Sequence, residues 1–199
     1  VEPAQKSFQA AMANAGQVCL AVKRAYVPSA IYDVFCDELA RLAGEAVVDE
    51  GTQQGAQIGP VQNKMQYEKL KGLLDSARSE GKIIAGGNAM DRDGYFIEPT
   101  IVRDVDDSAR IVREEQFGPV LPVLRYDEIE DVLARANDSD YGLGGSVWGT
   151  DIERATKIAE RVQSGTVWVN QHMGLAPNIP FRGAKQSGMG TELGQEGLN

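Results

Sequence analysis

Apolar residues recur at helical spacing in four stretches of the chain, and each stretch predicts an amphipathic helix. Ser29 is placed to cap the first helix, and a capping-box pattern over residues 150–153, beginning at Thr150, opens the last one. The apolar faces of the four helices are, in order, Ile31, Val34, Phe35, Leu39 and Leu42; Tyr67, Leu70, Leu73, Leu74 and Ala77; Ile129, Val132, Leu133 and Ala136; and Ile152, Ala155, Ile158, Ala159 and Val162.

Short runs of β-branched and apolar residues lie between these helices and predict strands. Strands that alternate with helices of this length form a largely parallel sheet, because parallel strands need crossover connections. The predicted fold class is therefore α/β, with an open, mostly parallel, doubly wound sheet and helices on both faces. The predicted strands are residues 24–27, 82–85, 96–102, 120–125, 145–148 and 166–170.

Two stretches lack this periodicity and predict irregular structure. Residues 44–60 contain four glycines, Gly51, Gly55 and Gly59 among them, and indicate a long loop, and residues 173–199 contain six. The chain has no internal repeat and no long linker rich in Pro and Ser. We therefore expect residues 1–199 to form one domain.

Composition and charge exclude several classes of protein. The chain has 199 residues, 42% of them hydrophobic, and a formal net charge of −9. An acidic surface repels phosphate groups, so we expect neither a nucleic acid nor a membrane as a partner. Two cysteines are too few for a disulfide framework, which favours a cytoplasmic location, and one histidine leaves no ligand set for a structural metal.

The familiar nucleotide-binding and nucleophile motifs are absent from the sequence. There is no G-x-G-x-x-G after a predicted strand, no P-loop and no G-x-S-x-G elbow. Cys19 is flanked by small residues that would let a carbonyl group approach, and its own neighbourhood leaves burial and nucleophilic use both open. Cys36 lies on an apolar helix face, where burial is the better interpretation.

Five ordered motifs resemble the NAD(P)-dependent aldehyde dehydrogenase family. They cover nearly the whole chain, and we expect it to be the catalytic-domain segment of a longer enzyme whose cofactor-binding domain lies outside it. Such enzymes oxidise an aldehyde to a carboxylic acid with NAD or NADP, and homo-oligomers are expected among them. The motifs are NAGQVC at residues 14–19, GYFIEPT at 94–100, EEQFGPV at 114–120, GTVWVN at 165–170 and PFRGAKQSG at 180–188.

The resemblance implies roles for individual residues. Cys19 would attack the aldehyde to give a thiohemiacetal and then a thioester, and its own N–H would help to hold the oxyanion. Glu115 would bind the ribose hydroxyls of the cofactor and Phe117 would pack by the nicotinamide. Gln66 and Lys69 would reach towards the same ribose. We expect the neighbours of Cys19 to line the substrate pocket; they are Gln17, Val18 and Leu20.

The resemblance also shows departures and leaves alternatives. The family's oxyanion Asn and catalytic Glu precede this segment, so the segment alone is expected to be inactive as a dehydrogenase. Arg182 stands where the family has a glycine, and Met12-Ala13 where it often has aromatic residues, which leaves the aldehyde undefined. A thiol hydrolase built from Cys19 and His172 is one alternative. A non-catalytic oligomerisation module with an exposed apolar surface is another.

Overall fold

The structure, a computed structural model, describes residues 2–198 and divides them into two compact units. The boundary between the units falls between Asp127 and Glu128. Each unit has buried apolar residues of its own, and the two are described separately below. The organisation of residues 1–199 as one domain stays a prediction.

The first unit is built on a four-stranded sheet in the order β1-β4-β3-β2. The strands are β1 (Ala25–Pro28), β4 (Val120–Tyr126), β3 (Thr100–Arg103) and β2 (Lys82–Ala85). Both neighbours of β4 run parallel to it, and only β2 pairs in the antiparallel direction. The expected α/β class with a mostly parallel sheet is confirmed.

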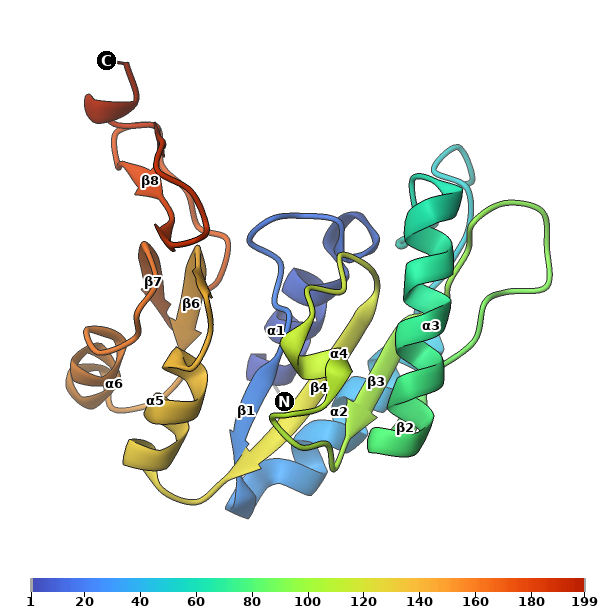
Figure 1. Cartoon of the computed structure of the whole chain (residues 1–199), viewed down its shortest axis with the longest axis horizontal. Helices are drawn as coiled ribbons and strands as arrows, with labels where there is room; N and C mark the ends of the chain where they lie inside the picture. The colour runs from blue at the N-terminus through green and yellow to red at the C-terminus, as the bar shows by residue number, and fades with distance from the viewer. Residues whose placement is uncertain (1, 199) are drawn as a thin grey trace. The chain divides into compact units, whose positions relative to one another are not determined.

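Helices cover both faces of this sheet (Figure 1). One face carries α1 (Glu2–Met12) and α2 (Tyr32–Glu45), and the other face carries α3 (Lys64–Glu80) and α4 (Arg110–Arg113). Strand residues alternate between the two faces, as the pleat requires. The side facing α1 and α2 holds Val27, Ile101, Leu121 and Val123, and the side facing α3 and α4 holds Val102, Val120 and Leu124.

Helix α3 follows its sequence pattern closely. The side chain of Asn63 accepts a hydrogen bond from the N–H of Gln66 at 2.9 Å and so caps the helix. The predicted apolar face is confirmed, because every member from Leu70 onward is buried. The buried residues of α3 are Leu70, Leu73, Leu74 and Ala77.

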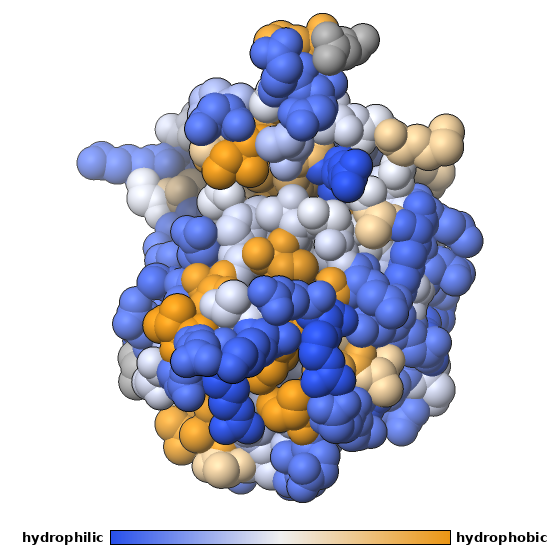
Figure 2. Space-filling view, turned by 90° about the vertical axis from the view of Figure 1, so that its left-hand side faces the viewer, coloured by the Kyte–Doolittle hydropathy of each residue, from blue (hydrophilic) through white to orange (hydrophobic). Residues whose placement is uncertain are grey.

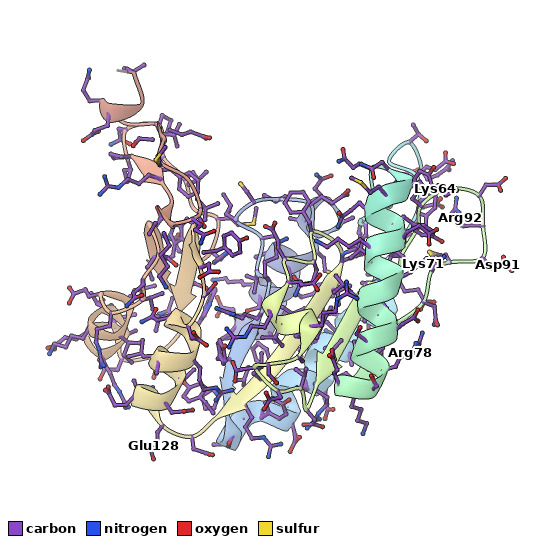
Figure 3. The ribbon with its side chains drawn as sticks, in the orientation of Figure 1. Lys64, Lys71, Arg78, Asp91, Arg92 and Glu128 are labelled. Carbon is purple, nitrogen blue, oxygen red and sulfur yellow. The ribbon has the colours of Figure 1, made fainter. Side chains whose placement is uncertain are left out.

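The outer side of α3 holds the loop that follows β2. Figure 3 shows Lys64, Lys71 and Arg78 one after another along the helix, with the loop beside them. The guanidinium of Arg78 donates to the carbonyl of Gly87 at 2.5 Å and to the side-chain oxygen of Asn88 at 3.0 Å. Arg78 thus fixes the start of this loop to the helix.

Helix α2 differs from the prediction at its start. It begins at Tyr32, after a short 3-10 turn η2 (Ser29–Ile31), and the Ser29 hydroxyl donates to the carbonyl of Tyr126 instead of capping. Ile31 and Val34 are exposed, so the predicted face was wrong there. Tyr32 enters the core in their place and shifts the buried face by one position. The buried residues of α2 are Tyr32, Cys36, Leu39 and Ala43, which confirms the burial of Cys36.

Helix α1 was not foreseen from the sequence. Its buried face is made largely of small side chains, and alanine gives a weak signal of amphipathic character. The helix runs directly into a 3-10 turn, η1 (Ala13–Gly16). The buried residues of α1 are Ala4, Ser7, Phe8, Ala10, Ala11 and Met12.

The predicted strand over residues 96–102 is shorter in the structure. Its regular part begins at Thr100, and Ile97 makes only an isolated bridge with Ala89. Residues 44–60 form a loop, as predicted, apart from the end of α2 and one bridge between Val48 and Ile58. Pro99 accounts for the shortening of the predicted strand 96–102, because it directly precedes Thr100 and has no N–H to donate to a neighbouring strand.

Within residues 128–198, the second unit contains two α-helices, one 3-10 turn and three strand pairs. The pair β6 (Gly144–Val147) and β7 (Thr166–Val169) is parallel, and the other pairs are antiparallel and two residues long. The C-terminal segment from residue 173 is largely irregular, as expected. The remaining elements are α5 (Ile129–Asn137), α6 (Ile152–Ala159), β5 (Tyr141–Gly142), β8 (Phe181–Arg182), β9 (Ala184–Lys185), β10 (Thr191–Glu192) and η3 (Glu196–Leu198).

Helix α6 begins one residue later than its sequence signal. Asp151, not Thr150, is the capping residue, and its carboxylate accepts from the N–H of Arg154 at 3.0 Å. Ile152 is exposed, and Val162 lies beyond the end of the helix, so two members of the predicted face were wrong. A carboxylate caps as well as a hydroxyl, which explains the shift.

The surface of the second unit mixes polar and apolar side chains. Figure 2 shows one face of the molecule, with orange apolar patches set among blue polar residues. Within residues 2–198, no helix combines the length and the apolar character needed to cross a membrane. The large apolar residues exposed on this unit are Tyr141, Ile152, Leu175, Ile179, Met189 and Leu198.

Candidate active site

Two loops of the first unit lie at the same edge of its sheet. One, the Cys19 loop, is residues 13–24 and leads into β1; the other, the Glu115 loop, is residues 114–119 and leads into β4. Because β1 and β4 are parallel neighbours, the loops that precede them emerge at one edge (Figure 1). The predicted nucleophile and the predicted cofactor residues are thus brought together.

Three successive residues near the start of the Cys19 loop lie in the left-handed region. Asn14, Ala15 and Gly16 have φ values of 50°, 55° and 70°. Asn and Gly tolerate this conformation, whereas Ala does so only under strain. Ala15 is buried, so the surrounding packing holds it there.

Cys19 lies at the tip of a turn. The N–H of Ala21 donates to the carbonyl of Val18 at 3.0 Å and closes the turn around the cysteine. The thiol is exposed, while the next side chain, Leu20, is buried and anchors the turn. The neighbours Gln17 and Val18 are half-buried. The structure therefore presents the Cys19 side chain to solvent from a fixed backbone.

Gly16 joins the two loops through backbone contact. A Cβ atom at Gly16 would lie 2.1 Å from the carbonyl oxygen of Gly118, and one at Gly118 would lie 2.4 Å from the side chain of Leu70. Only glycine permits this stacking of loop on loop on helix. The glycines before Cys19 and after Phe117 are thus required by packing.

Gln17 fastens the Cys19 loop to the segment before α3. Its amide nitrogen donates to the carbonyls of Asn14 at 3.0 Å and Pro60 at 3.2 Å, and its amide oxygen accepts from the N–H of Gln62 at 2.8 Å. With both ends of its amide engaged, Gln17 has a clear positioning function. Its part in a substrate pocket stays a prediction.

The Glu115 loop is held from α3 by Gln66 and Lys69. The amide of Gln66 donates to the carbonyls of Gln116 at 2.6 Å and Phe117 at 3.2 Å, and the ammonium of Lys69 donates to the carbonyl of Glu115 at 2.7 Å. Phe117 has φ of 49°, a left-handed conformation that these bonds stabilise. The structure shows both α3 side chains holding the loop; their contact with a ribose stays a prediction.

Lys23 is a member of this site that sequence reasoning missed. Its ammonium donates to the carbonyl of Gly16 at 2.6 Å and lies 4.9 Å from the centre of the Phe117 ring. Burial lowers the pKa of Lys23 to about 8, against the opposing effect of Glu115 and then Cys19. No spacing rule marks a lysine four residues after a cysteine, so the sequence held no signal for it.

Gln116 is a second residue that was missed. It is fully buried, and its amide nitrogen donates to the carbonyl of Ile111 and, at 3.1 Å, to that of Lys23. Its amide oxygen has no hydrogen-bond partner within residues 2–198. The buried Gln116 side chain therefore links the Glu115 loop to the end of the Cys19 loop by a hydrogen bond. Only the fold reveals this function.

The residues at this edge fit the chemistry of a dinucleotide cofactor. The Glu115 side chain is exposed. A carboxylate is the acceptor that paired ribose hydroxyls need. The half-buried ring of Phe117 provides an apolar face beside it.

His172 belongs to the second unit. Its ring packs edge-on against Trp168, with the ring centres 4.9 Å apart. Loss of thiol-ester hydrolysis in His172→Ala would support the Cys19/His172 hydrolase, which stays a hypothesis. Among residues 2–198, no group of three His, Cys, Asp or Glu side chains is arranged to hold a metal ion.

Comparison with known proteins identifies relatives along the whole chain. The model of the aldehyde dehydrogenase family matches residues 2–199. The mitochondrial aldehyde dehydrogenase of Leishmania tarentolae is 40% identical over 184 residues, covering 92% of this chain and 37% of that protein. Retinal dehydrogenase 2 of Gallus gallus is 41% identical over 199 residues, covering 98% and 38%. The chain thus spans less than half the length of these relatives.

Solved structures agree with the sequence matches. The NAD+ complex of an aldehyde dehydrogenase from Bacillus cereus superposes with a TM-score of 0.96 at 38% identity, covering 99% of this chain and 40% of that one. Betaine aldehyde dehydrogenase from Staphylococcus aureus, also in complex with NAD+, gives 0.95 at 37% identity, covering 99% and 40%. With sequence and fold in agreement, the chain belongs to the aldehyde dehydrogenase family.

Proposed function

We propose that this chain supplies the nucleophile for NAD(P)+-dependent oxidation of an aldehyde to a carboxylic acid. The thiolate of Cys19 adds to the aldehyde carbonyl carbon, and the carbonyl oxygen becomes the oxyanion of a thiohemiacetal. The N–H of Cys19, at the tip of its turn, donates to that oxyanion. Loss of hydride leaves a thioester on Cys19, and water then releases the acid and restores the thiol.

One observation carries this proposal: an exposed cysteine on a rigid turn lies at the same edge of the sheet as an exposed carboxylate. The turn is held by the buried Leu20 and by the Gly16 contact with Gly118, so the thiol meets a substrate without rearrangement of the backbone. Structural cysteines in contrast are buried, as Cys36 is.

The cofactor would be held by the Glu115 loop. Its carboxylate would accept from two ribose hydroxyls, with Phe117 against the nicotinamide and Gln66 and Lys69 fixing the loop. When bound, NAD(P)+ supplies the hydride acceptor of the reaction. Holding the loop from α3 keeps the Phe117 ring at the side of the Cys19 loop, as its contact with Lys23 indicates.

The test uses the complete gene product that contains this chain. It should reduce NAD+ when given an aldehyde, and Cys19→Ser should lower kcat by about a thousandfold or more, since the nucleophile is lost. Cys36→Ala is the matched control, because it removes the other thiol and should retain activity. Full dehydrogenase activity in Cys19→Ser contradicts the proposal.

Several finer expectations belong to the same proposal. Residues 1–199 alone should reduce no NAD+, and robust reduction by them would contradict the placement of the cofactor's main contacts outside the chain. Use of NAD or NADP as the cofactor is proposed in the same way. So are assembly as a homo-oligomer and a cytoplasmic location. The Leishmania tarentolae relative is named mitochondrial, so location needs direct measurement.

A further inference from the structure

Lys23 lies between the two loops of the site, with its ammonium over the ring of Phe117. The ammonium is 4.9 Å from the centre of that ring, which is within the range of a cation–π contact. The same ammonium donates to the Gly16 carbonyl of the Cys19 loop at 2.6 Å. One cation therefore contacts the aromatic ring of the Glu115 loop and the backbone of the Cys19 loop.

The backbone on both sides of this contact is fixed. The carbonyl of Lys23 accepts from the buried amide of Gln116 at 3.1 Å, and the carbonyl of Phe117 accepts from the amide of Gln66 at 3.2 Å. These bonds leave the two side-chain torsions of Phe117 unrestrained, and the ring is only half-buried. The contact with Lys23 acts on the torsions that the backbone bonds do not reach.

We infer that Lys23 is a positioning residue for Phe117: its ammonium holds the ring in one orientation against the Cys19 loop and leaves the opposite face of the ring open to the nicotinamide. The inference deepens the proposed function and rests on it, because a nicotinamide beside Phe117 is part of that proposal. It assigns to Lys23 no contact with the aldehyde or the cofactor. Lys23 acts through the ring.

The ammonium of Lys23 has the charge that such a contact requires. Burial lowers the pKa of Lys23 to about 8, against the opposing effect of Glu115, so most molecules carry the charge at pH 7. An exposed cation–π contact changes an equilibrium by about twofold to fivefold, and a desolvated one by more. For a half-buried lysine we therefore expect an effect of about threefold to tenfold.

The experiment measures binding of reduced cofactor to the complete gene product that contains this chain, by titration calorimetry at pH 7. The probe is NADH or NADPH, whichever the wild type binds more tightly, because the reduced nicotinamide is uncharged and meets no direct repulsion from an ammonium. Lys23→Met removes the charge and keeps a long unbranched side chain. It should raise the Kd by about threefold to tenfold, because a ring that is not held must be ordered on binding.

A double-mutant cycle separates positioning of the ring from a general structural effect. In a Phe117→Leu background no ring is left to hold, so Lys23→Met should change the Kd by less than about twofold there. An equal rise in Kd in both backgrounds would show that Lys23 acts without the ring and would overturn the inference. An unchanged Kd in Lys23→Met alone would overturn it as well.

Two further variants serve as controls. Lys23→Arg retains a cation that stacks on aromatic rings and should keep the Kd within about twofold of the wild type. Lys71→Met removes the same kind of contact elsewhere, because the Lys71 ammonium lies 5.3 Å from the centre of the Tyr67 ring on α3 (Figure 3). This matched control should leave the Kd unchanged.

A second measurement keeps Lys23 in place. Phenylalanine analogues with one, two and three ring fluorines at position 117 progressively weaken the attraction of the ring for a cation and change its size little. Each added fluorine should lower the urea midpoint of the purified chain. A midpoint that does not fall along the series overturns the inference even if Lys23→Met fails to fold.

Failure of this inference is distinguishable from failure of the proposed function. The fluorine series needs neither cofactor nor aldehyde and tests the contact between Lys23 and Phe117 directly. If the nicotinamide binds away from Phe117, Phe117→Leu alone leaves the Kd unchanged, and that result contradicts the proposed cofactor site. The activity of Cys19→Ser decides the proposed reaction independently of both.

Discussion

Tyr32 shows how one residue determines the phase of a helix. Its hydroxyl donates to the carbonyl of Val123 at 3.0 Å and accepts from the N–H of Asp104 at 2.9 Å. The guanidinium groups of Arg103 and Arg125 lie 4.8 and 4.5 Å from its ring centre. Burial of an aromatic ring with a satisfied hydroxyl outweighs the exposure of smaller aliphatic neighbours, which explains the rotation of α2.

Tyr32→Phe should therefore destabilise the first unit. The variant leaves a carbonyl and an N–H without their partner, which costs about 1–3 kcal/mol of unfolding free energy at pH 7. Burial raises the pKa of Tyr32 to about 12, so its contribution is complete below pH 10 and is lost as pH rises through 12. Urea unfolding of the wild type and of Tyr32→Phe should give a difference in unfolding free energy that narrows above pH 10. A difference that stays constant up to pH 12 contradicts this prediction.

Gly16 provides a second test of a single residue. Gly16→Ala should cost about 2–4 kcal/mol of unfolding free energy, because the new Cβ meets the Gly118 carbonyl and φ is 70°. Gly51→Ala is the matched control, with nothing within 4 Å of its added methyl group, and should change stability by less than about 0.5 kcal/mol. Equal urea midpoints for the two variants would exclude the loop contact.

Helix α3 connects stability to the site at the scale of an element. Its first turn is capped by Asn63, and the same turn and the next carry Gln66 and Lys69, which hold the Glu115 loop. Fraying of this helix end would therefore loosen the predicted cofactor residues. The cap thus bears on the geometry of Phe117 as well as on the helix itself.

Asn63→Ala should cost about 1 kcal/mol, the usual value of a lost N-cap. Hydrogen–deuterium exchange of the amides at the start of α3 and in the Glu115 loop should accelerate with it, since Gln66 donates its own N–H to the cap. Asn63→Asp retains an acceptor and should restore slow exchange. Acceleration confined to the helix, with the loop unaffected, would show that the two are not coupled.

Elements with strong periodicity could be predicted from the sequence, and the rest needed tertiary contacts. Helix α3 and the parallel strands follow from local patterns of apolar residues. Helix α1 did not, because its buried face is mostly alanine. In the site, Cys19 and Glu115 were found through motif resemblance, whereas Lys23 and Gln116 act through contacts across more than ninety positions of the chain, as the Gln116 bond to the Lys23 carbonyl shows.

At the scale of the whole molecule, the chain divides into two units, each with buried apolar residues. Leu73 belongs to the first unit and is fully buried beside α4 residues. Both tryptophans, Trp148 and Trp168, belong to the second unit. Tryptophan fluorescence therefore reports on the second unit, and tyrosine-dominated or far-ultraviolet signals include the first.

Leu73→Ala should lower the stability of the first unit by about 2–5 kcal/mol, the usual cost of a cavity in a core. We expect the tryptophan transition in urea to keep its midpoint while the far-ultraviolet circular dichroism transition moves to lower urea. Met65→Ala, on the exposed side of the same helix, is the control and should move neither. A tryptophan midpoint that shifts equally would instead support the single domain expected from the sequence.

The contact between Gly16 and Gly118 also has a consequence for the order of folding. The two glycines are roughly one hundred positions apart, and contacts at such separation form slowly because a long loop must close first. The Cys19 turn therefore acquires its final shape only after β4 has joined β1. During synthesis the Cys19 turn therefore stays unorganised until β4, roughly one hundred positions further along the chain, has been made.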